Sequence, residues 1–256
     1  MRSRRFKADQ LNVRIFVNRQ KAGLAAAIEA AQVLRRILGK QAAARVIVGS
    51  APSQNELLAG LGQVKEIDWK RVTLFHLDEY VGIPADHPAS FRNYQQRHLL
   101  AHVTPGVFHG IRGESGNPEA ECARYSALLA EAPIDLVCLG IGENGHIAFN
   151  DPPVANFADP LKVKVVELDE ACRRQQVHDE CFSNIESVPR KAITLTCPMI
   201  MSGRVLVCMV PGTRKATAVA AAVRGPVSTG CPASILRTHP SATLYLDHES
   251  AAKLKE

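Results

Sequence analysis

The stretch IDLVCLGIGENGHIAFNDPP, residues 134–153, joins an apolar run to a glycine-rich turn. Its apolar part, 134–142, predicts a β-strand buried on both faces, because short continuous apolar runs are typical of parallel sheets. The glycines match the Gly-x-Gly-x-x-Gly spacing of a dinucleotide-binding loop, which requires a helix that starts within the glycines. Pro152 and Pro153 prevent such a helix from continuing. The stretch therefore predicts a strand followed by a tight polar loop, not a nucleotide site.

Short apolar runs alternate with helical patterns on both sides of this stretch, which indicates a parallel sheet covered on both faces. We predict an α/β fold, namely a doubly wound, mostly parallel sheet that is Rossmann-like with three layers. Residues 13–256 are expected to form a single domain, and residues 1–12 a disordered or frayed basic N-terminus. In such sheets, ligands bind beyond the carboxyl ends of the strands. The expected strands are 13–17, 44–49, 72–80, 134–142, 161–168, 192–196, 204–210 and 242–247, and the expected helices are 21–40, 53–61, 90–103, 118–132, 172–182 and 213–225.

The composition of the 256 residues, 46% hydrophobic and 22% charged, is that of an ordinary globular protein. No uncharged apolar run approaches about 18 residues, which predicts no transmembrane helix and no membrane partner. The net charge is +6, but no stretch interleaves aromatic with basic residues, so we expect no nucleic-acid partner. The seven cysteines form no Cys-x-x-Cys pair, which favours a reduced, cytoplasmic protein.

Polar residues stand at the ends of two expected strands. Asp78 and Glu79 end one of them, and a carboxylate there can act as a general base if its pKa is raised. A solvated or capping pair is the alternative. The loop of the opening stretch presents Asn144, His146 and Asp151, and a histidine beside a carboxylate can transfer protons near neutral pH. A lone loop histidine is more often structural, but three clustered polar groups favour catalysis.

No serine or cysteine lies in a sharp nucleophile turn, and no residues have metal-ligand spacing. The pattern therefore favours acid–base chemistry on a small molecule without a cofactor, a metal or a covalent intermediate. The Gly49-Ser50 turn leads into a helix, and a helix start can hold a phosphate. With the basic residues that follow, it suggests a phosphate pocket, although each residue alone could be an ordinary surface group. The further candidates for substrate or phosphate contact are Ala51, Glu79, Gly145, Arg173, Arg174, His178, Arg214 and Lys215.

Four segments resemble the glucosamine-6-phosphate deaminase (isomerase) family, part of a wider group that includes 6-phosphogluconolactonase. They follow one another in the family order, so the resemblance covers most of the chain from about residue 13 onward. It implies the conversion of glucosamine 6-phosphate and water to fructose 6-phosphate and ammonia, without a redox cofactor or metal. The segments are FHLDEYVGIPADHPASF (75–91), DLVCLGIGENGHIAFNDP (135–152), VPRKAITLT (188–196) and VPGTRKATAVAAAVRGPV (210–227).

The resemblance implies a role for each polar residue of the two motifs. His146 helps to open the pyranose ring by moving a proton between O5 and O1. Asp151 orients or charges that histidine. Asn144 stands where some members have Asp and others Asn, so it can only form hydrogen bonds. Asp78 is the base that moves a proton between C2 and C1 of the open chain, through an enolamine-like intermediate, and Glu79 supports it.

The resemblance also implies a phosphate site. Lys215 matches a phosphate-binding lysine, and the Gly49-Ser50 turn matches the phosphate loop. Ala51 stands where the family generally has Thr, so one hydroxyl donor is lost. Asp151 is one methylene shorter than the usual Glu, so its reach to the histidine must be adjusted.

A third departure concerns the phosphate-binding arginine of the family, which aligns best with His178. Arg173 or Arg174 are the substitutes that the sequence offers. These changes motivate an alternative function, a sugar-phosphate sensor without turnover. The retention of Asp78 and His146 argues against it, because a pure binder needs no base.

The closest enzymatic rival is 6-phosphogluconolactonase, a hydrolase on the same fold. Its loop resembles Ala-Ser-Leu-Phe-Pro and its upstream motif ends in Asp-Glu-Arg, whereas residues 147–151 read Ile-Ala-Phe-Asn-Asp and 78–80 read Asp-Glu-Tyr. Both differences favour the deaminase. A related amino-sugar phosphate, such as galactosamine 6-phosphate, is harder to exclude. The family includes hexamers and monomers, so a homo-oligomer stays an open prediction.

Overall fold

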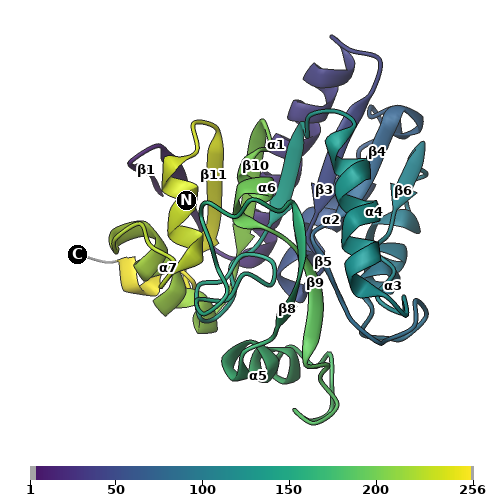
Figure 1. Cartoon of the computed structure of the whole chain (residues 1–256). Coiled ribbons are helices and arrows are strands. Elements are labelled where there is room, and N and C mark those ends of the chain that lie inside the picture. Colours follow the sequence, from purple (N-terminus) through teal and green to yellow (C-terminus); the bar gives the residue numbers. More distant parts are fainter. Residues whose placement is uncertain (1–3, 255–256) are drawn as a thin grey trace.

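An eight-stranded sheet forms the centre of the computed structural model, which describes residues 4–254 (Figure 1). Every neighbouring pair of strands is parallel except the β1–β2 hairpin. All residues of β3 are buried, as expected for a strand covered on both faces. The predicted mostly parallel, three-layer fold is therefore confirmed. In sheet order the strands are β1 (Arg4–Ala8), β2 (Leu11–Phe16), β11 (Ala242–Asp247), β10 (Val205–Val210), β7 (Leu136–Leu139), β3 (Ala44–Val48), β4 (Val72–His76) and β6 (Val107–His109).

Helices cover both faces of this sheet. α1 buries a row of alanines one turn apart, including Ala22, Ala26 and Ala30, which lets it lie close to the strands. Its first turn is capped by Asn18, whose side chain accepts from the backbone N–H of Lys21 at 2.9 Å. One face carries α1 (Arg19–Leu38) and α2 (Asn55–Gly62), and the other carries α4 (Pro118–Ala130), α6 (Cys197–Met201) and α7 (Ala216–Arg224).

A second, antiparallel sheet lies beside the first and was not predicted. It consists of β5 (Asp78–Tyr80), β9 (Lys191–Leu195) and β8 (Val163–Glu167). The expected strand 72–80 divides at Leu77, whose N–H bonds to Val48 in the large sheet and whose carbonyl accepts from Leu195 in the small one. The apolar pattern continues through this residue, so the sequence reads as one strand. Asp78, the first residue of β5, therefore lies at the junction of the two sheets.

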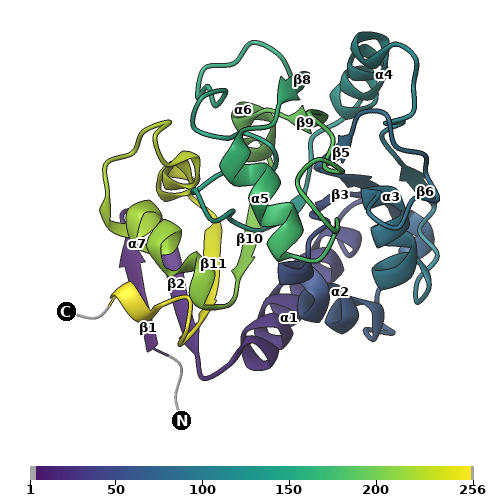
Figure 2. The same cartoon turned by 90° about the horizontal axis from the view of Figure 1, so that it is seen from below.

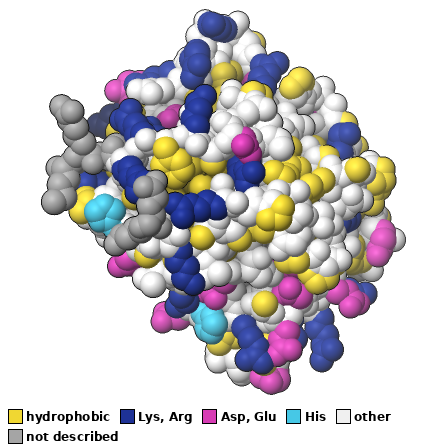
Figure 3. Space-filling model, turned by 90° about the vertical axis from the view of Figure 1, so that its left-hand side faces the viewer, with side chains coloured by type: hydrophobic (Ala, Val, Ile, Leu, Met, Phe, Trp, Pro, Cys, Tyr) yellow, Lys and Arg dark blue, Asp and Glu magenta, His cyan; other side chains and the backbone are white. Residues whose placement is uncertain are grey.

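The N-terminus differs from the expectation of a frayed segment over 1–12. Residues 4–8 form β1, which pairs with β2 in register from Arg4 opposite Ile15 to Ala8 opposite Leu11. Phe6 packs against the core, while its basic neighbours are exposed. Figure 3 shows several Lys and Arg side chains on one face of the molecule. Strand pairing therefore orders a run whose composition alone suggests a solvated tail. Residues 1–3 lie outside the described part of the chain.

The chain order of the strands reverses at β3, because the sheet order falls from β11 through β10 and β7 to β3 and then rises through β4 to β6. The loops that leave β3, β4, β7 and β10 converge at their carboxyl ends, and α5 (Glu170–His178) lies in front of the sheet there when seen from below (Figure 2). None of the helices within residues 4–254 is long and apolar enough to cross a membrane. The remaining helical turns are Pro52–Gln54, Trp69–Arg71, α3 (Phe91–Gln95), Gln96–Leu100, Thr213–Lys215, Pro232–Thr238 and Ala252–Leu254.

Candidate active site

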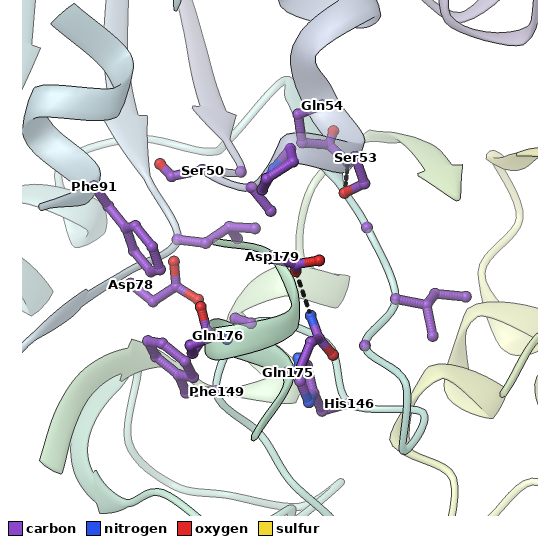
Figure 4. A pocket seen from close by; sticks show the side chains of 18 of the residues that line it. Ser50, Ser53, Gln54, Asp78, Phe91, His146, Phe149, Gln175, Gln176 and Asp179 are labelled. Atoms are coloured by element: carbon purple, nitrogen blue, oxygen red, sulfur yellow. Dashed lines mark hydrogen bonds between the residues drawn. The ribbon is translucent and has the colours of Figure 1, made fainter. Parts of the chain in front are cut away.

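A cleft with about 590 Å³ of empty space, open to solvent, lies at this convergence. Its position at the carboxyl ends of the strands is the one expected for a doubly wound sheet. Figure 4 shows Asp78 and Phe91 on one side, His146 on another, and α5 residues between them. The polar groups that line it include Ser50, Asp78, His146, Gln176 and Lys215, and the apolar ones include Leu77, Phe91 and Phe149.

Asp78 faces the cleft and is almost buried, with 7% of its surface exposed. Burial, followed by the charge of Glu79, raises the pKa of its carboxyl well above the usual range. Among residues 4–254, none donates a hydrogen bond to this carboxylate with ordinary geometry. A basic oxygen is therefore available to a molecule in the cleft.

Glu79, which we predicted to contact substrate, lies away from the cleft. Successive residues of a strand point to opposite sides, so Glu79 faces α3, where it is fully buried. It accepts hydrogen bonds from the hydroxyl of Ser90 at 2.8 Å and from the backbone N–H groups of Phe91 and Arg92, both at 3.0 Å. Burial raises the pKa of Glu79, and these donors oppose the rise. Glu79 thus fixes the start of α3.

His146 and Asp151 form a close pair. Nδ1 of His146 lies 2.8 Å from Oδ1 of Asp151, so the shorter acidic side chain still reaches the histidine. Asn144 donates to the same oxygen at 3.0 Å, and its own oxygen accepts from the backbone N–H of His146 at 3.0 Å. Burial opposes ionisation of Asp151, but His146 and Asn144 outweigh it and lower the pKa of the carboxyl. The loop therefore holds an anion behind the histidine of the cleft.

Two glycines shape this loop. A side chain at Gly142 would place its Cβ about 2.2 Å from the ring of His146, so only glycine lets the ring fold back over the turn. Gly145 has φ +88°, which favours glycine, and it packs against Cys231 instead of contacting the cleft as predicted. No helix follows, which agrees with the rejection of a nucleotide loop. Both glycines therefore help to position the ring of His146.

The opposite end of the cleft carries groups suited to an anion. Gly49, Ser50 and Ala51 line it as predicted. Gln95 donates to the Ser50 hydroxyl oxygen at 2.8 Å, which leaves the hydroxyl hydrogen free to donate to a ligand. Lys215 also lines the cleft, with 7% of its surface exposed. Burial lowers the pKa of its ammonium, and the nearby carboxylates of Asp179 and Glu143 oppose this.

The basic residues predicted on α5 do not line the cleft. Arg173 donates to the carbonyl of Val188 at 3.1 Å and so holds the segment that follows the helix. The side chain of His178 is 51% exposed and faces Glu143 at 3.4 Å. Arg174 pairs with Glu170 on the surface. The structure therefore offers no α5 cation as a substitute for a phosphate-binding arginine.

The cleft face of α5 is instead formed by Gln175, Gln176 and Asp179, which we did not predict. Gln175 accepts from the backbone N–H of Glu143 at 2.7 Å, and Gln176 accepts from the hydroxyl of Tyr80 at 2.6 Å. Both amide groups are thus oriented by fixed partners. The available signal was their helical spacing, because with Cys172 they recur at i, i+3, i+4 and i+7 on one face.

Cys172 brings a third donor to the histidine loop. The ligand atoms of His146, Asp151 and Cys172 all lie within 4.8 Å of one another, and all three residues are buried. This is a donor set that could hold a metal ion. Sequence spacing could not indicate it, because the thiol comes from α5 and the other two groups from the loop after β7.

Residues 18–245 match a family described as glucosamine-6-phosphate isomerases/6-phosphogluconolactonase. A glucosamine-6-phosphate deaminase of Listeria innocua is 39% identical over 189 residues, which cover 74% of this chain and 79% of the relative. The deaminase of Streptomyces avermitilis is 37% identical over 231 residues, 88% of this chain and 87% of the relative.

Solved structures agree with this similarity. The structure of a monomeric glucosamine-6-phosphate deaminase matches with a TM-score of 0.85 and 29% identity, over 94% of this chain and 99% of the other. A 6-phosphogluconolactonase of Trypanosoma brucei has a TM-score of 0.76 at 18% identity, over 95% and 98%, and shows only the shared fold. The resemblance predicted from the sequence is confirmed, and the chain belongs to the family of glucosamine-6-phosphate isomerases and 6-phosphogluconolactonases.

Proposed function

We propose that this protein is an enzyme that converts glucosamine 6-phosphate and water to fructose 6-phosphate and ammonia. The observation that carries the proposal is the composition of one cleft. The buried carboxylate of Asp78, which receives no hydrogen bond of ordinary geometry from residues 4–254, shares this cleft with the His146–Asp151 pair and with the ammonium of Lys215. Relatives named as deaminases support the same reaction. The chemistry needs neither a cofactor nor a metal.

In the first step, His146 opens the pyranose ring by moving a proton between O1 and O5. Asp151 stabilises the imidazolium that forms when the ring nitrogen accepts this proton, because an anion within ion-pair distance favours the charged form. Asn144 keeps the carboxylate in place. The product is an open-chain aldehyde with the amino group on C2.

In the second step, the carboxylate of Asp78 takes the proton from C2, and the electron pair forms the C1–C2 double bond of an enolamine while O1 gains a proton from solvent. Return of the proton from Asp78 to C1 leaves an iminium ion at C2. Water adds to C2, and ammonia and one proton depart to solvent, which gives the ketone. The raised pKa makes the carboxylate a stronger base, and activity should fall as the pH drops below that pKa.

The phosphate is proposed to bind where Lys215, the Ser50 hydroxyl and the Gly49–Ala51 backbone meet the cleft. Lys215 is the one cation that lines this cleft among the described residues. A buried ammonium contacts a phosphate more strongly than a surface one, because less water screens the pair. The nearby carboxylate of Asp179 weakens this attraction. We therefore expect modest phosphate affinity.

Ammonia and fructose 6-phosphate release from glucosamine 6-phosphate tests the reaction, with galactosamine 6-phosphate and 6-phosphogluconolactone as rival substrates. Ammonia from the gluco substrate at the highest kcat/KM is expected. Hydrolysis of the lactone alone would replace the proposal by its closest rival. Calorimetric binding of glucosamine 6-phosphate without ammonia release would support a sensor instead.

We also propose that the protein works in a reducing, cytoplasmic setting, which its seven unpaired cysteines support. A similar deaminase is monomeric, which supports a monomer as an alternative to the homo-oligomer that the sequence left open. Light scattering of the purified chain at working concentration decides between them.

A further inference from the structure

A buried pocket, in the sense of a cluster of three groups that can bind a metal, includes the histidine that lines the cleft. The imidazole of His146, the carboxylate of Asp151 and the thiol of Cys172 have ligand atoms within 4.8 Å of one another. Asp151 is fully buried, and its Oδ2 atom has no hydrogen-bond partner of ordinary geometry in residues 4–254. A buried carboxylate oxygen is normally satisfied, so this atom is available to a ligand.

We propose that this pocket binds a borderline or soft divalent transition-metal ion, for which Zn²⁺ is the best fit, and that occupation inhibits the enzyme. Imidazole, thiolate and carboxylate are the three ligand types of zinc sites, whereas Mg²⁺ and Ca²⁺ prefer oxygen alone. Three protein ligands leave one position of a tetrahedral shell for water. His146 lines the cleft, which provides the path of entry.

The charges of the site favour a divalent ion. The carboxylate and a thiolate together carry two negative charges, which a divalent cation neutralises, so no net charge is left buried. A thiol binds a metal as the thiolate, so metal binding releases its proton.

Inhibition follows from the shared histidine. The metal takes the imidazole nitrogen and the carboxylate that would otherwise support proton transfer during ring opening. This consequence rests on the proposed function, whereas metal binding itself does not. Cys172 has no part in the proposed reaction, so a serine there should spare the metal-free activity while it removes the soft ligand.

Two measurements test the site, with Cys181→Ser as the matched control because Cys181 is a nearby thiol that lines the cleft but is not one of the three proposed ligands. Co²⁺ added to the purified protein should give thiolate-to-metal charge-transfer absorption in the native chain and in Cys181→Ser, but not in Cys172→Ser. In zinc-buffered assays, Cys172→Ser should need at least about tenfold more free Zn²⁺ for half inhibition. Cys181→Ser should change this by less than about twofold, each variant being compared with its own metal-free rate.

The proposal is overturned if the native chain gives no such absorption at saturating Co²⁺, or if Cys172→Ser keeps the native zinc sensitivity. Equal loss of sensitivity in Cys181→Ser would assign the metal to a different thiol. The absorption measurement needs no turnover, so it still decides metal binding if glucosamine 6-phosphate is not the substrate. Cys172→Ala serves as the second variant if the serine variant does not fold.

Discussion

The two ends of the cleft are built differently. At the acid–base end, formed by Asp78, Asn144, His146 and Asp151, the loop residues are held by short contacts within a few positions of one another. At the anion end, formed by Gly49, Ser50, Ala51 and Lys215, the groups come from distant segments and include a single cation. Asp179 adds a negative charge beside that cation.

This difference separates two requirements of the site. Proton transfer depends on exact spacing between a few groups, and one tight loop supplies that spacing for Asn144, His146 and Asp151. Anion binding depends on total charge and on donors that several elements contribute, so it can change by substitution without loss of the reaction. We therefore expect substitutions at the acid–base end to lower kcat, and those at the anion end to raise KM.

The largest effect is expected from Asp78→Asn. Loss of the base should lower kcat by about 10²–10⁴-fold, because general-base catalysis contributes that much, while binding stays close to native. Ammonia release gives kcat, and calorimetry with the alditol 6-phosphate, which cannot react, gives binding. A kcat within tenfold of the native value would show that Asp78 is not the general base. It would also contradict the expectation that substitutions at the acid–base end lower kcat.

The next largest effect is expected from Lys215→Met. Loss of the buried ammonium should raise KM by about 10–100-fold, since a charge-assisted hydrogen bond contributes about 1.5–3 kcal/mol, and kcat should change less. Arg174→Gln is the control, because Arg174 pairs with Glu170 on the surface away from the cleft. If KM rises as much in Arg174→Gln, α5 does supply a phosphate ligand and the anion end is described incorrectly.

Two buried carboxylates of the acid–base end should change stability in opposite directions. Folding raises the pKa of Asp78, so its ionisation destabilises the fold once the pH rises above 3.8, and Asp78→Asn should increase Tm at pH 7. Folding lowers the pKa of Asp151, so its charge stabilises above 3.8 and this contribution is lost as the pH falls through the folded value. Asp151→Asn should lower Tm at pH 7.

Each shift should be about 2–4 °C, which corresponds to about 1 kcal/mol for a chain of this size. Thermal unfolding at pH 7 and near pH 3 measures it, because the difference between the variants should shrink at the lower pH. Shifts of the same sign at pH 7 would contradict the assignment of Asp78 as a carboxylate destabilised by burial and of Asp151 as a stabilised anion.

The smallest effect is expected from Ala51→Thr, which restores a hydroxyl at the anion end. One added donor to phosphate should lower KM by about 2–5-fold, equivalent to about 0.5–1 kcal/mol. Ser50→Ala should raise KM by a similar factor, because it removes the hydroxyl that Gln95 orients. Initial-rate measurements across substrate concentration are sufficient. A change in kcat alone would mean that position 51 touches the reacting atoms and not the phosphate.

Features that depend on neighbours in sequence were predicted well. The apolar strands, the Ala-rich α1 and the glycine loop follow from local pattern, and the rule for carboxyl strand ends located the cleft. Features that depend on which way a side chain points were predicted poorly. Glu79 turned away by strand alternation, and Arg173 and His178 lie off the cleft face of their helix.

The sequence by itself determined the fold class, the family, and the loop in which Asn144 orients His146 and Asp151, because all of these rest on residue type and short spacing. Only the tertiary structure decided that residues 4–8 are a strand, that the strand through Leu77 is shared by two sheets, and that Gln175, Gln176 and Cys172 face the active site. The physical reason is that strand pairing and helix rotation are set by long-range burial, which no local pattern contains.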